Sequence, residues 1–185
     1  MQLKGLEEAL NKFGKYVVQQ ARTNLTKKKR NVSKNLYNSL GYKPFNEDGA
    51  IGVRFTMEDY GKFIDKGVKG SSPTDLPKGS KNYGKQQAPN SPYKFGAGTK
   101  SAGGGLRKNI DQWVVRKKVF KENVRDKKGK FIKRKGLVYK ITRSIYLSGI
   151  KPSMFFTKPF QQAYKNLPKE LQENFITDIE KIIFK

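Results

Sequence analysis

Long amphipathic segments stand near both ends of the chain. In residues 2–25, apolar side chains recur every three or four positions, which is the period of one helical face. A second stripe follows Pro159, is kinked or broken at Pro168, and continues to Ile183. An amphipathic helix usually turns its apolar stripe toward its own core. We therefore predict that both helices cover a small sheet, and a partner helix is the alternative for the first stripe.

Strand patterns are short and favour hairpins. Apolar residues alternate over 50–55, and the sequence Asn-Glu-Asp-Gly at 46–49 supplies a turn from 42–45. Residues 119–132 predict a second hairpin, with a basic tip at 126–129. The apolar run that begins at Ile150 predicts one further strand, to Phe156, and its Pro152 favours the edge of a sheet because proline cannot donate to the ladder.

Shorter helices are expected between these elements. Their predicted spans are 34–40, 58–66, 106–114 and 137–148. Ser33 is the expected N-cap of the first, and Gly149 is expected to end the last. The third carries Trp113. If Trp113 lies in the core, Trp113→Ala destabilises the fold by about 3–5 kcal/mol, and wild-type stability of the variant would instead indicate an exposed ring that binds a partner.

Residues 68–105 differ from the rest in composition. They are rich in Gly, Ser, Pro, Lys and Asn and carry few aliphatic side chains. A loop of this length is uncommon inside a compact domain and is usually functional or disordered. We predict an extended loop or arm over 68–105 and a basic β-hairpin insertion over 119–135, both attached to a single domain that spans residues 1–185.

These patterns together predict the α+β class. The expected fold is a small, mostly antiparallel sheet packed by long N- and C-terminal helices, with a long Gly/Pro/Lys-rich loop and a basic hairpin insertion. The hydrophobic share of 35% is below the roughly 45–50% of ordinary globular chains, so the expected core is modest.

Missing residue types remove several kinds of chemistry. The chain has no Cys, which excludes disulfides and thiolate nucleophiles, and no His, which removes the commonest general base and metal ligand. No apolar run reaches the roughly 18–20 residues of a membrane span, and the N-terminal segment lacks the apolar core of a signal peptide. We expect no cofactor, no membrane contact, and a protein made in the cytoplasm.

Charge is the strongest compositional signal. Forty Lys and Arg against fifteen Asp and Glu give a formal net charge of +25, which favours a polyanionic partner. The candidate polyanion or partner contacts are Lys27, Lys28, Lys29, Arg30, Lys127, Lys128, Lys130, Lys133, Arg134 and Lys135. Such clusters bind a phosphate backbone without reading bases. Solubility of exposed loops is the alternative explanation.

Two catalytic hypotheses are weak on the sequence. Residues 96–101, Gly-Ala-Gly-Thr-Lys-Ser, lack the second glycine of a phosphate-binding loop, and no strand leads into them. Glu58, Asp59 and Asp65 are close enough in sequence to suggest a metal-dependent nuclease. Neighbouring residues on a helix diverge by about 100°, however, so an exposed helix explains the first two carboxylates as well.

Four segments stand in a distinctive order along the chain. The first is Leu-Tyr-Asn-Ser-Leu at 36–40, after the opening helix. The second is the aromatic segment 60–67, which ends in Gly before the long loop. The third is the Trp helix at 110–117. The fourth, 141–160, contains Arg-Ser-Ile, Gly-Ile-Lys-Pro and a Phe-Phe pair before Pro-Phe.

The order of these four segments resembles the tail-completion and head–tail joining proteins of tailed bacteriophages. The resemblance implies a virion structural protein and no catalysis. Proteins of this family form homo-oligomeric rings in the neck or upper tail and line part of the channel through which the genome passes. The implied partners are copies of the chain itself and the portal, connector and tail proteins of the particle. The basic clusters also allow non-specific contact with genomic DNA. A free basic nucleic-acid-binding protein is the alternative function.

Overall fold

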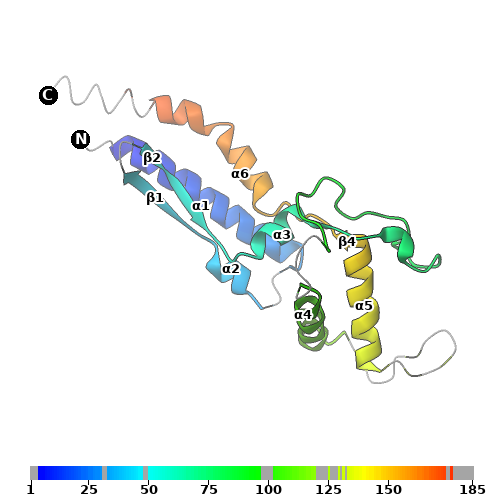
Figure 1. The fold of residues 1–185 in the computed structure, drawn as a ribbon. Coiled ribbons are helices and arrows are strands. Elements are labelled where there is room, and N and C mark those ends of the chain that lie inside the picture. Colours follow the sequence, from blue (N-terminus) through cyan, green and yellow to red (C-terminus); the bar gives the residue numbers. More distant parts are fainter. Residues whose placement is uncertain are drawn as a thin grey trace. The chain divides into compact units, whose positions relative to one another are not determined.

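The protein has an α+β fold in the computed structural model (Figure 1). The structure describes residues 4–30, 33–47, 50–96, 102–119, 125, 129, 131, 133–173 and 176. The chain divides into two compact units. The first unit is Met1–Gly61 with Met154–Lys185, and the second is Lys62–Ser153. The expectation of one domain over 1–185 stays a prediction.

The first unit packs helices against a hairpin. Its elements are α1 (Lys4–Lys27), α2 (Asn35–Ser39), β1 (Gly41–Glu47), β2 (Ala50–Thr56) and α6 (Thr157–Tyr164). Strands β1 and β2 pair in antiparallel register from Gly41 opposite Thr56 to Glu47 opposite Ala50. In Figure 1, α1 and α6 run alongside this hairpin, and both helices contact it or each other. The predictions of the long first helix and of this hairpin are confirmed.

An aromatic cluster joins the two ends of the chain inside the first unit. The ring of Phe13 on α1 meets those of Phe55 on β2 and Phe160 on α6 edge to face, with centroids 5.9 and 5.7 Å apart. Phe156 meets Phe55 in the same way at 5.3 Å. Leu167, from a helical turn at 167–173 that follows α6, is buried in the same core. Edge-to-face rings add about 0.5–1.5 kcal/mol per pair beyond the area that they bury.

Close approach of α1 to the hairpin depends on one glycine. Gly14 is buried, and a Cβ built there would overlap the Tyr42 ring, whose Cγ atom would lie 2.8 Å away. Because Cγ belongs to the rigid ring, relief of this overlap would require the whole Tyr42 ring to turn about its Cα–Cβ bond, which costs more than moving a flexible chain end. Gly14 therefore sets how closely α1 lies on β1.

The second unit is built on short strands and two long helices. Its elements are α3 (Gly61–Lys66), β3 (Val68–Lys69), the 3-10 turn η1 (Pro73–Asp75), α4 (Ala102–Arg116), α5 (Arg134–Ser148) and β4 (Gly149–Ile150). Strands β3 and β4 pair antiparallel, with Val68 opposite Ile150. Gly67 and Gly149 have φ values of 72° and 95°, which glycine adopts without strain, and each one ends a helix as predicted.

The expectation of an extended arm at 68–105 is corrected for most of its length. Ser91 Oγ donates to the Gly67 carbonyl at 2.7 Å and is buried. The Gln86 side chain accepts from the Gly70 amide at 2.6 Å and donates to the Gly70 carbonyl at 3.1 Å. Residue 94 then forms a parallel bridge with Lys69. The loop therefore folds back along β3 because polar side chains satisfy its backbone, and its last residues, from Ala102, already belong to α4.

Several predicted boundaries also differ. Lys34, at φ 57°, stands at the N-cap of α2 in place of Ser33. The strand expected over 150–156 ends at Ile150, because the backbone turns away there and Met154 has φ 51°. Of the hairpin expected at 119–135, an antiparallel bridge between Arg125 and Phe131 is described. Much of the rest lies outside the described residues, and α5 begins earlier than expected, at Arg134.

Two helical glycines should respond oppositely to alanine. Gly14→Ala gains up to about 1 kcal/mol of helix propensity but meets Tyr42, and overpacking of this kind costs about 1–3 kcal/mol. A Cβ added at Gly105 in α4 would meet no atom within 4 Å, so Gly105→Ala should be neutral or stabilising. Urea unfolding of both variants tests this, and a Gly14→Ala protein more stable than wild type would contradict it.

Candidate polyanion-binding site

The positive charge is unequally divided between the two units. Residues 62–153 hold 24 of the 40 Lys and Arg and only 5 of the 15 Asp and Glu, a formal charge of +19. The first unit carries the remaining +6. Because the positive charge is concentrated in the second unit, its electrostatic potential favours the approach of polyanions to that unit and would raise their rate of encounter.

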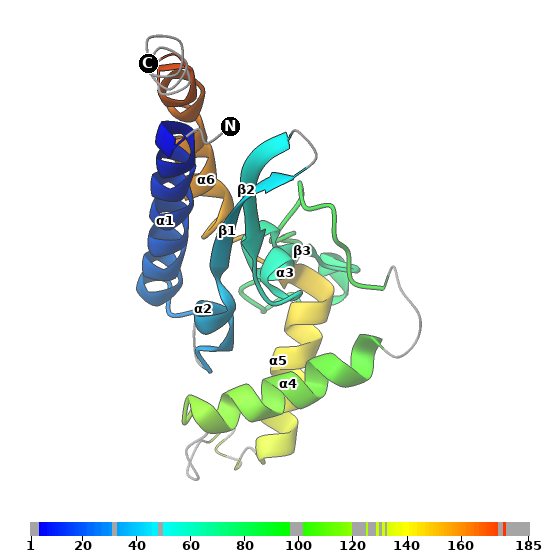
Figure 2. The ribbon, with the colours of Figure 1, turned by 90° about the vertical axis from the view of Figure 1, so that its left-hand side faces the viewer.

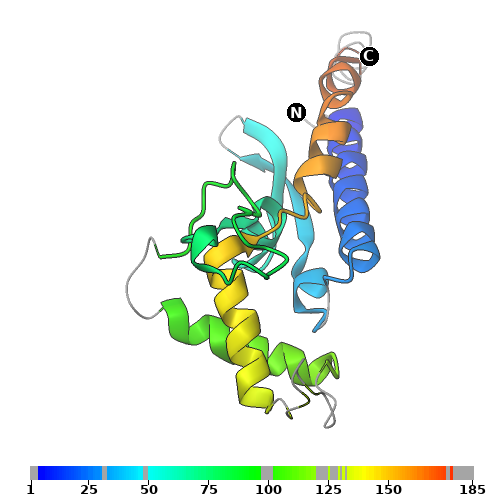
Figure 3. The same ribbon diagram turned by 90° about the vertical axis from the view of Figure 1, so that its right-hand side faces the viewer.

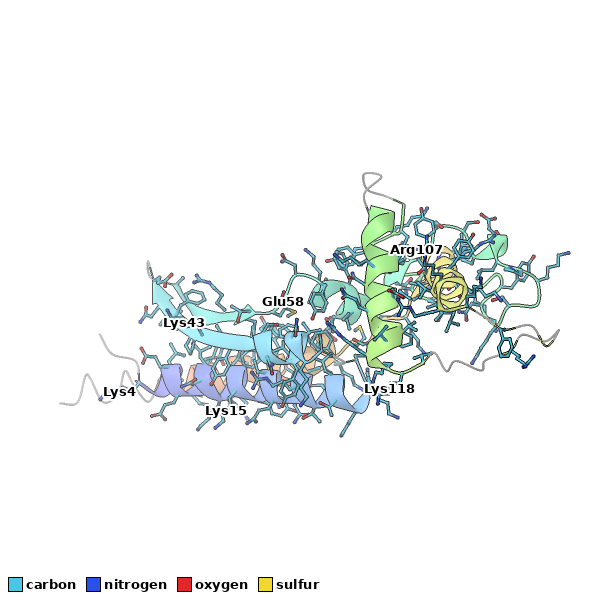
Figure 4. All side chains as sticks on the ribbon, turned by 90° about the horizontal axis from the view of Figure 1, so that it is seen from below. Lys4, Lys15, Lys43, Glu58, Arg107 and Lys118 are labelled. Carbon is cyan, nitrogen blue, oxygen red and sulfur yellow. The ribbon has the colours of Figure 1, made fainter. Side chains whose placement is uncertain are left out.

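Helices α4 and α5 cross within this unit and form a basic groove between them. Figures 2 and 3 show the crossing from opposite sides. The groove has a volume of about 390 Å³. Arg107 and Lys108 line it from α4, and Arg134 and Lys135 line it from α5. Figure 4 labels Arg107, together with Lys118 just beyond the other end of α4. All four lining cations are exposed, so an anion can reach them without any rearrangement of the core.

One carboxylate orients part of this groove. Arg134 Nε lies 3.2 Å from Asp111 Oδ1, and the Arg134 terminal nitrogen donates to Oδ2 at 3.3 Å. Two parallel contacts of this type hold the planar guanidinium in one orientation. Both side chains are partly exposed, at 49% and 39%, so the pair adds at most about 1 kcal/mol to stability. The effect of the pair is to position Arg134. Asp111 is the one carboxylate among the lining residues of the groove, beside four basic side chains.

The start of α5 adds a second source of positive potential. The first turn of a helix carries partial positive charge from its amides, so cations there are unfavourable by about 0.3–1 kcal/mol. Arg134 and Lys135 nevertheless occupy that turn, and α5 contains no acidic residue. A bound phosphate would relieve the repulsion and interact favourably with the helix dipole at the same time.

The aromatic side chains of the two helices are partly exposed. Trp113 is 37% exposed, so the condition for the larger destabilisation, a Trp113 ring in the core, is not met. The neighbouring Val114 is fully buried in its place, because successive helix positions point about 100° apart. Trp113→Ala should therefore cost less than the 3–5 kcal/mol expected of a buried ring. On α5, Tyr139 is 53% exposed.

The predicted basic clusters are placed differently from one another. Lys27 ends α1 and residues 28–30 follow it, all of them exposed and in the first unit. Cations at a helix C-terminus are favoured by the dipole, which gives this cluster a structural explanation. Lys133, Arg134 and Lys135 stand at the start of α5 and not in the expected hairpin. Lys127, Lys128 and Lys130 lie outside the described residues.

Sequence reasoning missed Arg107 and Lys108. They do not belong to a long basic run, and only the crossing of α4 with α5 brings them beside Arg134 and Lys135. The spacing of Arg107 and Asp111, four positions apart on one helical face, was the available signal.

The carboxylates proposed for a nuclease do not form a described cluster. Glu58 and Asp59 are exposed in the first unit, whereas Asp65 is 4% exposed and belongs to the second. Burial and the nearby Glu58 carboxylate raise the pKa of the Tyr60 phenol above its usual value. Within the described ranges, no group of three or more acidic residues is placed to hold a metal ion.

No helix in the described part of the chain is long and apolar enough to cross a membrane.

Comparison of the chain with protein-family models, with curated proteins and with solved structures found no match.

Removal of the α4 cations should weaken polyanion binding. We expect Arg107→Ala with Lys108→Ala to lower affinity for duplex DNA and to reduce the slope of log affinity against log salt by about 2, one per lost phosphate contact. Fluorescence anisotropy over a salt series measures both quantities. The matched control is Lys12→Ala with Lys15→Ala on the exposed side of α1, which removes the same charge from the less basic unit. Equal losses in both double variants would show that net charge, and not this groove, governs binding.

Proposed function

We propose that this chain is a structural subunit of a tailed-bacteriophage virion. In this role it forms a homo-oligomeric ring in the head–tail connector, neck or upper tail, completes the tail, and lines part of the genome channel. The observation that carries the proposal is the order and spacing of the four segments at 36–40, 60–67, 110–117 and 141–160. Their order resembles that of the phage family, and we assign a catalytic role to none of them.

The fold is compatible with this role in two respects. The fourth segment runs from α5 through β4 to α6, so the residues that carry the resemblance include the link from the second unit back to the first. The first unit also buries the aromatic side chains of that segment, Phe156 and Phe160, against Phe13 and Phe55. The need to bury these aromatic side chains explains why an apolar run that contains prolines leads into α6.

Contact with DNA is the second function that a specific observation favours. The charge of +19 on the second unit and the α4–α5 groove suit a free basic nucleic-acid-binding protein as well as a ring subunit beside the genome. The two functions differ in where the protein is found. A ring subunit remains in mature particles, whereas a free DNA-binding protein remains in the infected-cell lysate.

Deletion of the gene from its phage should separate head and tail assembly. We expect filled heads and free tails without joined particles, and restoration of plaques when the chain is supplied from a plasmid. Mass spectrometry of purified wild-type particles should detect the protein, and negative-stain images of the isolated protein should show rings. Infectious particles that lack the protein would overturn the proposal.

A further inference from the structure

A groove in the first unit combines carboxylates with apolar walls. It has a volume of about 540 Å³ and lies between the start of α1 and the β1–β2 hairpin. Glu7 and Glu8 line it from α1, and Phe45 and Ile51 line it from the hairpin. Lys4 also lines the groove, and Figure 4 labels it beside the start of α1. The groove can therefore hold an apolar side chain between exposed carboxylates.

The position of Phe45 is set by the hairpin itself. Phe45 pairs with Gly52 across the strands, and a Cβ at Gly52 would lie only 2.8 Å from the ring. The aromatic ring thus covers the glycine, while the Arg54 guanidinium lies 5.2 Å from the ring centroid. These contacts place the Phe45 ring on the face of the hairpin that carries Gly52 and Arg54. Alternate positions of a strand point to opposite faces, so Pro44 and Ile51 supply the apolar wall on the side of α1.

The second unit presents a ridge of matching chemistry. Tyr139, Lys140 and Arg143 lie on one exposed face of α5, about 100° wide. Tyr139 is 53% exposed, and the Arg143 guanidinium makes one long hydrogen bond, 3.4 Å, to the Asp75 carbonyl. Lys135 stands one turn before Tyr139 on this face and also lines the basic groove, so the ridge and the basic groove adjoin each other on α5. An aromatic ring flanked by cations is the complement of an apolar groove edged by carboxylates.

We propose that the α1–hairpin groove of one copy binds the Tyr139–Lys140–Arg143 ridge of a second copy. Tyr139 occupies the apolar part of the groove beside Pro44 and Ile51, and the two cations pair with Glu7 and Glu8. A helix face laid into a groove is a common recognition mode. The choice of a second copy rests on charge, because the second unit carries +19 and this groove of the less basic unit offers two exposed carboxylates beside apolar side chains.

The two surfaces differ, so the contact is head-to-tail. Repetition of such a contact closes into a ring when its rotation divides a full turn, and gives an open filament otherwise. The inference rests on the proposed function for its biological setting, and it names the surfaces through which a ring would close.

Charge reversal on each surface tests the contact. The groove variant is Glu7→Lys with Glu8→Lys, and the ridge variant is Lys140→Glu with Arg143→Glu; all four side chains are exposed, so we expect the fold to survive. Sedimentation velocity should show that the wild-type chain self-associates and that each variant alone does so at least tenfold more weakly. An equimolar mixture of the two variants should regain association, because the reversed charges then attract across the interface. Tyr139→Ser should weaken association without changing charge.

Matched controls separate this contact from net charge. Glu58→Lys with Asp59→Lys applies the same change as the groove variant beyond the far end of β2, and Lys78→Glu with Lys81→Glu matches the ridge variant elsewhere in its unit. Neither control should alter association. Wild-type association should also weaken at 1 M salt, where the screening length is about 3 Å.

The outcomes distinguish this inference from the proposed function. Wild-type oligomers that both reversal variants still form overturn the inference and leave the ring intact. Failure of the mixture to regain association overturns it as well. A wild-type chain that stays monomeric at every concentration overturns both, and a chain that associates only when duplex DNA is added favours nucleic-acid binding over either.

Discussion

The packing of the two chain ends against each other determines the rest of this structure. Phe13 near the N-terminus and Phe160 near the C-terminus share one aromatic cluster with Phe55. Once these residues are buried together, the 92 residues between Gly61 and Met154 must leave this unit and return to it. The return is secured inside the second unit, where the amide and hydroxyl of Ser153 both donate to the Ile64 carbonyl, at 3.0 and 2.7 Å, and Val68 pairs with Ile150.

The parts of the fold that could be predicted are those with local, periodic signals. The α1 stripe and the β1–β2 alternation were read correctly because burial in each case follows from a repeat of a few residues. The folded conformation of the long loop after β3 could not be predicted from the sequence. It depends on Gln86 and Ser91, whose polar side chains form hydrogen bonds with backbone groups 16 and 24 residues away. The burial of Trp113 was left open for a related reason: the apolar stripe includes both Trp113 and Val114, and it is Val114 that occupies its buried centre.

The candidate site was only partly visible in the sequence. Runs of lysine and arginine are conspicuous, and they led to Arg134 and Lys135. Their partners Arg107 and Lys108 are separated from them by more than 20 residues and meet them only through the crossing of α4 and α5. The sequence also does not distinguish a cluster that a helix end explains, such as Lys27 to Arg30, from one that opposes the helix dipole, such as the start of α5.

The pairing of the first and last residues of the second unit has an evolutionary consequence. Ile64, Val68, Ile150 and Ser153 secure both exits of the chain within a few residues of the junction. Recombination that lengthens, shortens or exchanges the stretch between them leaves the aromatic cluster unchanged.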